Sequence, residues 1–354
     1  MPRMHAAAII EDAFHRRTTS LLVRRGWKPR AVAHTGYGTP AFLRVLGRVL
    51  LSRHALDPDL VHADAGAGPK KLGPEPLVRG WRAFITAQAI GRGVTVTVNG
   101  IPHRTQTDRG GYVDLTITEH DLEPGWHEVT IAPDGGKPVQ ARVVVVDPNV
   151  RFGLVSDIDD TVISTLLPRP LIAAWNTFVM HEQARHIVPG MAPMYRRLLE
   201  SHPGAPIFYL STGAWNTAAN LTRFLAEHAS PPGPLLLTDW GPTNTGWFRS
   251  GQDHKRENLH RLAREFPFIR WVLVGDDGQH DPKIYGDFAR DRPDVVRCIA
   301  IRELSTAEQV LSHGLPVSNE ELFVPRVHRE TPVVRNPDGY GLLRQVLTVL
   351  ARVR

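Results

Sequence analysis

Cysteine is nearly absent from this sequence: its 354 residues include one, Cys298. No intramolecular disulfide can form, so the chain shows no sign of being built for an oxidising compartment. Apolar runs of about 20 residues, the length that spans a bilayer as a helix, are also absent. The segment from Met1 to Asp12 lacks the basic stretch and apolar stretch of a signal peptide. We therefore expect a cytoplasmic protein with no transmembrane segment, and peripheral membrane contact stays open.

Basic residues are in only modest excess over acidic ones. The chain has 42 Lys and Arg against 36 Asp and Glu, a formal net charge of +6. This excess favours anionic partners such as phosphate esters, acidic lipid surfaces or nucleic acid. No nucleic-acid-binding motif and no interleaving of aromatic with basic residues is present, so we do not expect a nucleic-acid binder. The length predicts two or three domains, and the oligomeric state cannot be read from the sequence.

The first part of the chain is predicted to be mainly β. Residues 1–29 form a helical segment that ends near Gly26, and residues 30–148 form a β domain with a Gly- and Pro-rich linker near 57–76. Valines alternate with threonines at 94–98 and lead into Asn99-Gly100, which predicts a hairpin. Further strands are expected at 42–51, 111–118, 126–131 and 139–146, and together they predict an antiparallel sandwich. The 42–51 stretch also fits a helical face, but we favour a strand.

The pattern changes after residue 149 to apolar strands that alternate with helical segments. The strands are expected at 152–156, 206–211, 235–238, 271–275 and 296–301. This alternation predicts an α/β fold for residues 149–310, a mainly parallel sheet that binds ligands at the carboxyl ends of its strands. Residues 311–354 are expected to form an extension with a terminal helix from Leu342.

Two acidic clusters follow apolar strands. Asp157 and Asp159 are two residues apart, so in an extended chain they face one side. Clustered carboxylates repel each other unless a cation or a proton lies between them, which indicates magnesium, calcium or acid/base chemistry. Asp276, Asp277 and Asp281 follow a second strand about 120 residues later. Adjacent parallel strands would bring the two clusters together as an oxygen-ligand cage for a hard cation.

Ser211, Thr212, Gly213 and Lys255 lie between the clusters, and their hydroxyls and ammonium group suit a phosphoryl group. Each residue has an ordinary alternative when taken alone. A serine or Asp281 could cap a helix, and a lysine usually lies at the surface. Arg302, after the last predicted strand, could contact an anionic substrate, but we expect it to make a surface ion pair. The order of all the motifs outweighs these alternatives.

The DIDDT, LSTG, Lys and GDDGQHD series resembles the four motifs of the haloacid dehalogenase (HAD) superfamily of phosphotransferases, over residues 150–305. The resemblance implies a HAD-like Rossmannoid sheet with a small or absent cap. It also implies a nucleophile at Asp157, an acid/base at Asp159, phosphoryl contacts from Ser211 and neutralisation by Lys255. Further implied contacts are phosphate binding by Thr161, Thr212 and Gly213, and Mg²⁺ binding by Asp157, Asp159 and Asp276 with Asp281 or, alternatively, Asp277.

The RGWRAF, TDRGGY and PGWH segments and the long GDDGQHDPKIYGDFA segment look like the actin-patch-protein family of phosphatidate phosphatases. That resemblance implies a magnesium-dependent phosphomonoesterase that forms an aspartyl-phosphate and acts on a lipid phosphate, phosphatidate at a membrane surface. A phosphoprotein, a nucleic-acid end or a soluble metabolite stays open as the substrate. A catalytically silent interaction protein is a further alternative, against which the intact Asp157, Asp159, Lys255 and Asp276 argue.

Overall fold

The computed structural model describes residues 21–53, 87–165, 185–238, 251–278, 280–306, 308–309 and 331–352. The chain divides into two compact units with a boundary between Asp147 and Pro148. The first unit contains residues 1–147, and residues 218–223 are grouped with it. The predicted linker near 57–76, most of the predicted N-terminal helix and the RGWRAF segment lie outside the described residues.

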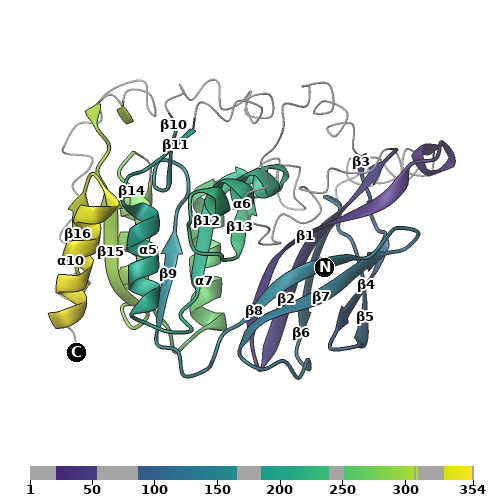
Figure 1. Cartoon of the computed structure of the whole chain (residues 1–354), viewed down its shortest axis with the longest axis horizontal. Helices are drawn as coiled ribbons and strands as arrows, with labels where there is room; N and C mark the ends of the chain where they lie inside the picture. The colour runs from purple at the N-terminus through teal and green to yellow at the C-terminus, as the bar shows by residue number, and fades with distance from the viewer. Residues whose placement is uncertain are drawn as a thin grey trace. The chain divides into compact units, whose positions relative to one another are not determined.

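The first unit is built on one eight-stranded sheet (Figure 1). Its strands are β1 (Lys28–Thr39), β2 (Phe42–Ser52), β3 (Ala87–Gln88), β4 (Gly93–Val98), β5 (Ile101–Gln106), β6 (Tyr112–Ile117), β7 (Gly125–Pro133) and β8 (Val139–Val145). The strand order is β3-β2-β1-β8-β7-β4-β5, and β6 pairs with β2. The β1–β8 pair is parallel and the other pairs are antiparallel.

Local sequence accounts for several of these strands. Val94, Val96 and Val98 are buried while the intervening threonines are partly exposed, the two-residue period of a half-buried strand. Asn99 and Gly100 adopt φ values of 48° and 80°, which the tight turn between β4 and β5 requires. The predicted hairpin is therefore confirmed, as is the strand at 42–51, which lies within β2.

The predicted sandwich of separate sheets is replaced by a single curled sheet. β2 pairs with β1 along one edge and with both β3 and β6 along the other. The register of β1 against β2 shifts between His34 and Tyr37, and such irregularities bend a strand. Bending lets one continuous sheet enclose the core, whose members come from β1, β2, β4, β6, β7 and β8. The turn after helical residues 21–24 ends at Gly26, φ 84°, as expected.

The second unit contains a six-stranded sheet of order β13-β12-β9-β14-β15-β16 in which every neighbouring pair is parallel. Its strands are β9 (Phe152–Ser156), β12 (Ile207–Ala214), β13 (Leu235–Thr238), β14 (Arg270–Asp276), β15 (Val296–Arg302) and β16 (Val333–Asn336). β10 (Ile163–Thr165) and β11 (Arg185–Ile187) form a separate antiparallel pair. The helices are α5 (Met191–Glu200), α7 (Gly251–Glu265), α8 (Asp281–Asp291) and α10 (Gly339–Arg352). A further helix, α6 (Ala218–Glu227), begins in the residues grouped with the first unit and ends in the second.

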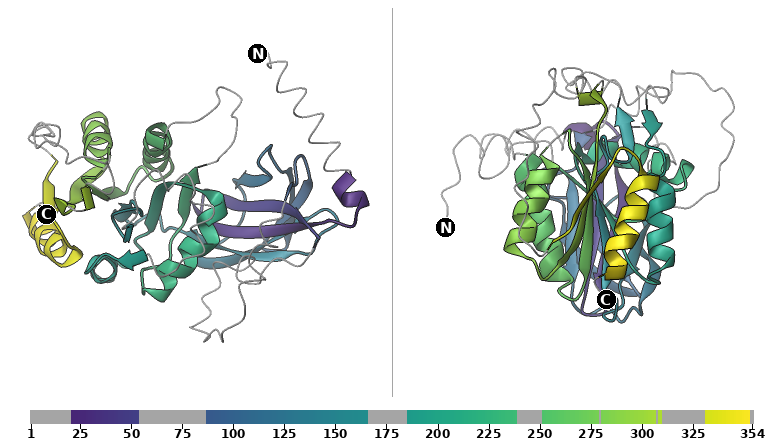
Figure 2. Two further views of the ribbon diagram at one scale, coloured as in Figure 1. Left: turned by 90° about the horizontal axis from the view of Figure 1, so that it is seen from above. Right: turned by 90° about the vertical axis from the view of Figure 1, so that its left-hand side faces the viewer.

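Helices cover both faces of this parallel sheet. Figure 2 shows α7 and α8 on one face and α5 and α10 on the other. β9 is buried at every residue, as are all but the first residue of β14, because such a sheet has no solvent-facing side. The predicted α/β class and terminal helix are confirmed; β16 was not predicted. Among the described residues, no helix combines the length and apolar content needed to cross a bilayer.

The strand order fixes where a ligand site can form. β9 lies between β12 and β14, and the chain passes from β9 to β12 on one side before it returns to β14 on the other. In open α/β sheets, ligands bind beyond the carboxyl ends of the strands at such a reversal. Predicted site residues lie at the carboxyl ends of β9, β12 and β14 or just beyond them, and Lys255 lies in α7.

Candidate active site

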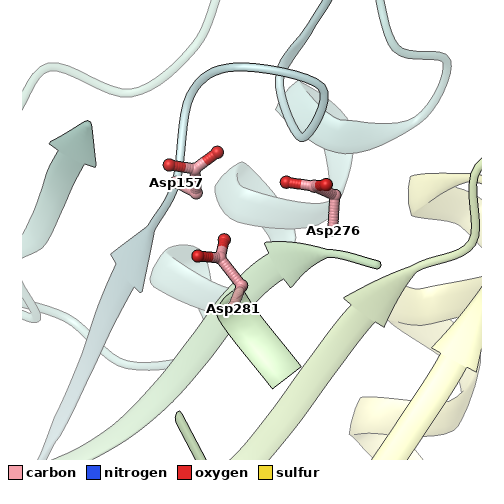
Figure 3. Close-up of side chains that lie close together, drawn as sticks. All are labelled: Asp157, Asp276 and Asp281. Carbon is pink, nitrogen blue, oxygen red and sulfur yellow. The ribbon is translucent and has the colours of Figure 1, made fainter. Parts of the chain in front are cut away.

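Three aspartates meet at this edge of the sheet. Asp157 directly follows β9, Asp276 ends β14 and Asp281 begins α8. One carboxylate oxygen from each lies within 4.8 Å of the others, and Figure 3 shows the three side chains pointing toward one another. All three are buried, with exposures of 0–2%. The N–H of Asp157 donates to Val274 O at 2.8 Å, which ties the end of β9 to β14.

Lys255 of α7 supplies a positive charge to this cluster. It is buried, and its Nζ lies 2.6 Å from Asp157 Oδ1 and 2.5 Å from Asp281 Oδ1. Burial alone would lower the pKa of Lys255, but the adjacent Asp157 and Asp281 outweigh it and raise that pKa. The ammonium group is therefore held in its charged form.

One lysine does not balance three buried carboxylates. Burial, reinforced by the neighbouring carboxylates, raises the pKa of Asp157 and of Asp276 well above the ordinary value. Asp157 Oδ2 and Asp281 Oδ2 are buried without a hydrogen-bond partner among the described residues. Unsatisfied buried carboxylate oxygens are costly, and an all-oxygen donor set is the kind that hard divalent cations bind. The residues present therefore fit a magnesium-type ion.

Ser211, in β12, connects to the loop after β9. Its Oγ donates to Asp159 Oδ2 at 2.8 Å and accepts from the N–H of Gly213 at 2.9 Å. Thr238 Oγ1, at the end of β13, donates to Thr212 O at 2.8 Å and so ties β13 to the carboxyl end of β12. Asp159 is half-buried and Ser211 is buried.

The structure separates the two aspartates that the sequence left as alternatives. Asp281 lies in the cluster, whereas Asp277 does not. Asp277 Oδ1 accepts from Leu304 N at 2.8 Å, and its Oδ2 lies 3.8 Å from Arg335. Adjacent residues of an extended chain point to opposite sides, so Asp277 is directed away from Asp276.

Residues 152–303 match the sequence model of the catalytic domain of phosphatidate phosphatase APP1. They form an APP1-type catalytic domain. Saccharomyces cerevisiae phosphatidate phosphatase APP1 is 28% identical over 171 residues, which cover 48% of this chain and 29% of that protein. An uncharacterized Schizosaccharomyces pombe protein is 24% identical over 169 residues, 48% of this chain and 27% of that protein. The chain thus spans less than a third of the length of these relatives.

Solved structures add little to this assignment. A crystal structure of an uncharacterized protein from Listeria monocytogenes serotype 4b aligns with 56% of this chain and 99% of that chain, at 13% identity and a TM-score of 0.38. A carbohydrate acetylesterase from Xanthomonas citri aligns with 81% of this chain and 74% of that chain, at 10% identity and a TM-score of 0.28. Scores this low support no inference about the fold.

Within the APP1-type domain, the remaining predicted residue, Thr161, reaches the cluster from the side. It is fully buried, and its Oγ1 donates to Asp276 Oδ2 at 3.4 Å. The N–H of Gly278 donates to Asp276 Oδ1 at 2.8 Å. These contacts orient Asp276, so in this structure Thr161 touches a carboxylate of the cluster.

Two residues of the APP1-type domain were missed or misjudged from sequence. A Cβ at Gly275 would lie 2.5 Å from Asp281 Oδ2, so glycine at this position leaves room for Asp281; the signal was the glycine that opens the GDD segment. Arg302 was expected in a surface ion pair; it does pair with Glu308 at 2.6 Å, but it is buried and also donates to the Asp160 carbonyl at 2.7 Å. Nothing local in the sequence distinguishes a buried arginine from an exposed one.

Proposed function

We propose that the APP1-type domain is a HAD-like, magnesium-dependent phosphomonoesterase that forms a transient aspartyl-phosphate on Asp157 and acts on a phosphatidate-type lipid. The observation that carries this proposal is the buried cluster in which Lys255 contacts Asp157 and Asp281 while one oxygen of each carboxylate stays unpartnered among the described residues. Such a cluster costs stability in the absence of a bound cation, and functional sites characteristically carry such costs.

Asp157 has the geometry of a nucleophile. Its Oδ1 is held by Lys255, while Oδ2 is free for bonding within the described part of the chain. In the proposed reaction this oxygen forms a bond to phosphorus as the bond from phosphorus to the leaving alkoxide breaks. Lys255 then neutralises charge on the phosphorylated side chain.

Asp159 is the proposed proton carrier. It gives a proton to the leaving alkoxide, then accepts one from the water that attacks phosphorus and breaks the bond to Asp157, which restores both carboxyl groups. The hydrogen bond from Ser211 Oγ to Asp159 Oδ2 fixes this side chain beside the end of β12, where Thr212 and Gly213 are the proposed phosphate contacts.

Asp157, Asp276 and Asp281 would hold the Mg²⁺ ion. Asp159, which shares the loop after β9 with Asp157, is a further candidate oxygen ligand. When bound, the ion would screen the negative charge of the phosphoryl oxygens. The ion would also give the buried Oδ2 atoms of Asp157 and Asp281 the partner that they lack among the described residues.

A lipid phosphate is the substrate favoured by the family match and by the net charge of +6. A basic protein is drawn to anionic membrane surfaces by a salt-sensitive attraction, which fits a cytoplasmic enzyme that binds membranes peripherally. A phosphoprotein, a nucleic-acid end or a soluble ester would use the same chemistry.

The decisive experiment measures phosphate release with Mg²⁺ from phosphatidate in mixed micelles and from soluble phosphomonoesters. Asp157→Asn should abolish release, because an amide cannot form the acyl-phosphate, while Asp287→Asn is the matched control. Asp287 lies on the surface of α8 and pairs with Lys283 and Arg290. Activity in Asp157→Asn above about a tenth of the unmutated level would overturn the nucleophile assignment.

The substrate is tested in the same preparation. Faster release from phosphatidate than from soluble esters, together with vesicle co-sedimentation that weakens at high salt, is the expected result. Soluble esters turned over at least as efficiently, without salt-sensitive vesicle binding, would remove the lipid assignment and leave the phosphatase assignment intact.

A further inference from the structure

Arg302 joins the loop after β9 to the segments that contain Glu308 and Pro337. It is the last residue of β15 and is 6% exposed. One guanidinium nitrogen donates to the Asp160 carbonyl at 2.7 Å, a second to Glu308 Oε1 at 2.6 Å, and Nε to the Pro337 carbonyl at 3.3 Å. A buried guanidinium is tolerated when its donors are matched by acceptors in this way.

The contact with Asp160 falls inside the proposed catalytic loop, because Asp160 directly follows Asp159. Asp160 has φ 58°, a left-handed conformation that residues other than glycine adopt uncommonly. Its N–H donates to Ile163 O at 2.7 Å, and its carbonyl accepts from Arg302. The loop conformation that sets Asp157 and Asp159 relative to each other is thus held from β15.

Glu308 extends the same connection to β10. Its Oε1 also accepts from Ser164 Oγ at 3.0 Å, and its Oε2 accepts from the N–H and Oγ of Ser305 at 2.8 and 2.9 Å. Burial alone would raise the pKa of Glu308, but Arg302 and Ser305 outweigh it and lower that pKa to about 2. Glu308 is therefore ionised at neutral pH and forms an ion pair with Arg302 at 2.6 Å.

We propose that Arg302 is a positioning residue for the phosphatase reaction, holding the loop of Asp157 and Asp159 through the Asp160 carbonyl, and β10 through Glu308 and Ser164. The proposal rests on the proposed function. Arg302 acts through its neighbours, since its three donors are taken up by Asp160, Glu308 and Pro337. Small displacements of reacting groups cost large factors in rate, so loss of this connection should be felt in turnover.

The test compares Arg302→Met, Arg302→Lys and Glu308→Gln with Arg292→Met as the matched control. Arg292 also makes a bidentate ion pair, with Asp294, but it precedes the first residue of β15, at the end of that strand opposite to Arg302. At a temperature where every variant is folded, Arg302→Met should lower kcat tenfold or more while KM changes less than about threefold. Arg302→Lys should recover part of the loss, Glu308→Gln should lower kcat severalfold, and Arg292→Met should match the unmutated protein.

Hydrogen exchange of the amides at 158–165 gives a second readout that needs no turnover. Exchange there should be faster in Arg302→Met and Glu308→Gln than in the control. A kcat within twofold of the unmutated value, or unchanged exchange in this segment, would overturn the proposal. If Arg302→Met does not fold, Arg302→Lys and Glu308→Gln decide by the same criteria. If the unmutated protein releases no phosphate from any ester, the proposed function fails. The exchange result still tests whether Arg302 restrains the loop after β9.

Discussion

Asp276→Asn should make the protein more stable without divalent cations and less responsive to them. Asp276 is fully buried, and one of its oxygens lies within 4.8 Å of oxygens of Asp157 and Asp281. Two unit charges at that separation repel by about 3 kcal/mol at an effective dielectric constant near 20. Lys255 offsets part of this repulsion, because it pairs with the other two carboxylates. We therefore expect a net gain of about 1–3 kcal/mol in the free energy of unfolding of the second unit.

The substitution should cost little in packing or hydrogen bonding. Asparagine has the shape of aspartate, and its carbonyl can still accept from the N–H of Gly278. Its amide group would face Thr161 Oγ1, which can accept a hydrogen bond in place of donating one. The dominant change is therefore the removal of one negative charge from a buried cluster.

Magnesium should stabilise the unmutated protein more than Asp276→Asn. A ligand at 100 times its dissociation constant stabilises the form that binds it by about 2.7 kcal/mol. The unmutated protein should gain this amount on Mg²⁺ addition, while Asp276→Asn, which lacks one carboxylate of the cage, should gain much less.

The assay is urea unfolding of both proteins in chelator and across a Mg²⁺ titration, with Asp287→Asn as a surface control expected to shift by less than about 0.5 kcal/mol. A loss of more than about 1 kcal/mol for Asp276→Asn in chelator would show that this carboxylate is not under net repulsion. Equal Mg²⁺ stabilisation of both proteins would place the ion elsewhere.

Three further predictions concern individual residues. Asp281→Asn should weaken Mg²⁺ binding, measured by calorimetry, by a larger factor than Asp277→Asn, since Asp281 alone of the two lies in the cluster; the opposite ranking would contradict the geometry. Gly275→Ala should lower the free energy of unfolding by about 1–3 kcal/mol and reduce Mg²⁺ affinity, because its Cβ would meet Asp281 Oδ2; wild-type affinity would argue that the side chain moves aside freely. Burial, with help from Arg48, lowers the pKa of His34 to about 3, so the unfolded chain binds a proton below pH 6.5 that the folded chain does not. Stability therefore falls as pH drops from about 6.5 toward 3, by about 2 kcal/mol at pH 5, and denaturant titrations of His34→Gln at pH 7 and 5 should lack this contribution.

Much of the second unit could be predicted because its main strands contain short, mostly apolar runs. The predicted strand at 152–156 coincides with β9, and the one at 235–238 coincides with β13. β16 escaped prediction because Val333–Asn336 offers two apolar residues, and pairing with β15 makes it a strand. Tertiary pairing can thus create an element that the local pattern does not announce.

The first unit shows the opposite limit. Alternation and the Asn99-Gly100 turn predicted individual strands, but they could not predict how the strands join. Whether two groups of strands form separate sheets or one curled sheet depends on which edges pair. Here β2 pairs with β1 along one edge and with β6 along the other, and the irregular register between His34 and Tyr37 bends β1. An alternating pattern of apolar residues specifies neither feature.

The sequence by itself determined the chemistry of the candidate site: carboxylates after two apolar strands, a serine after a third, and a lysine between the two acidic clusters. Those identities and their order along the chain are local properties. Only the tertiary structure decided that Asp281 joins Asp157 and Asp276 while Asp277 turns away, and that Arg302 is buried against the Asp160 carbonyl. Each depends on side-chain direction at the edge of a parallel sheet, where residues more than 100 positions apart in sequence become neighbours.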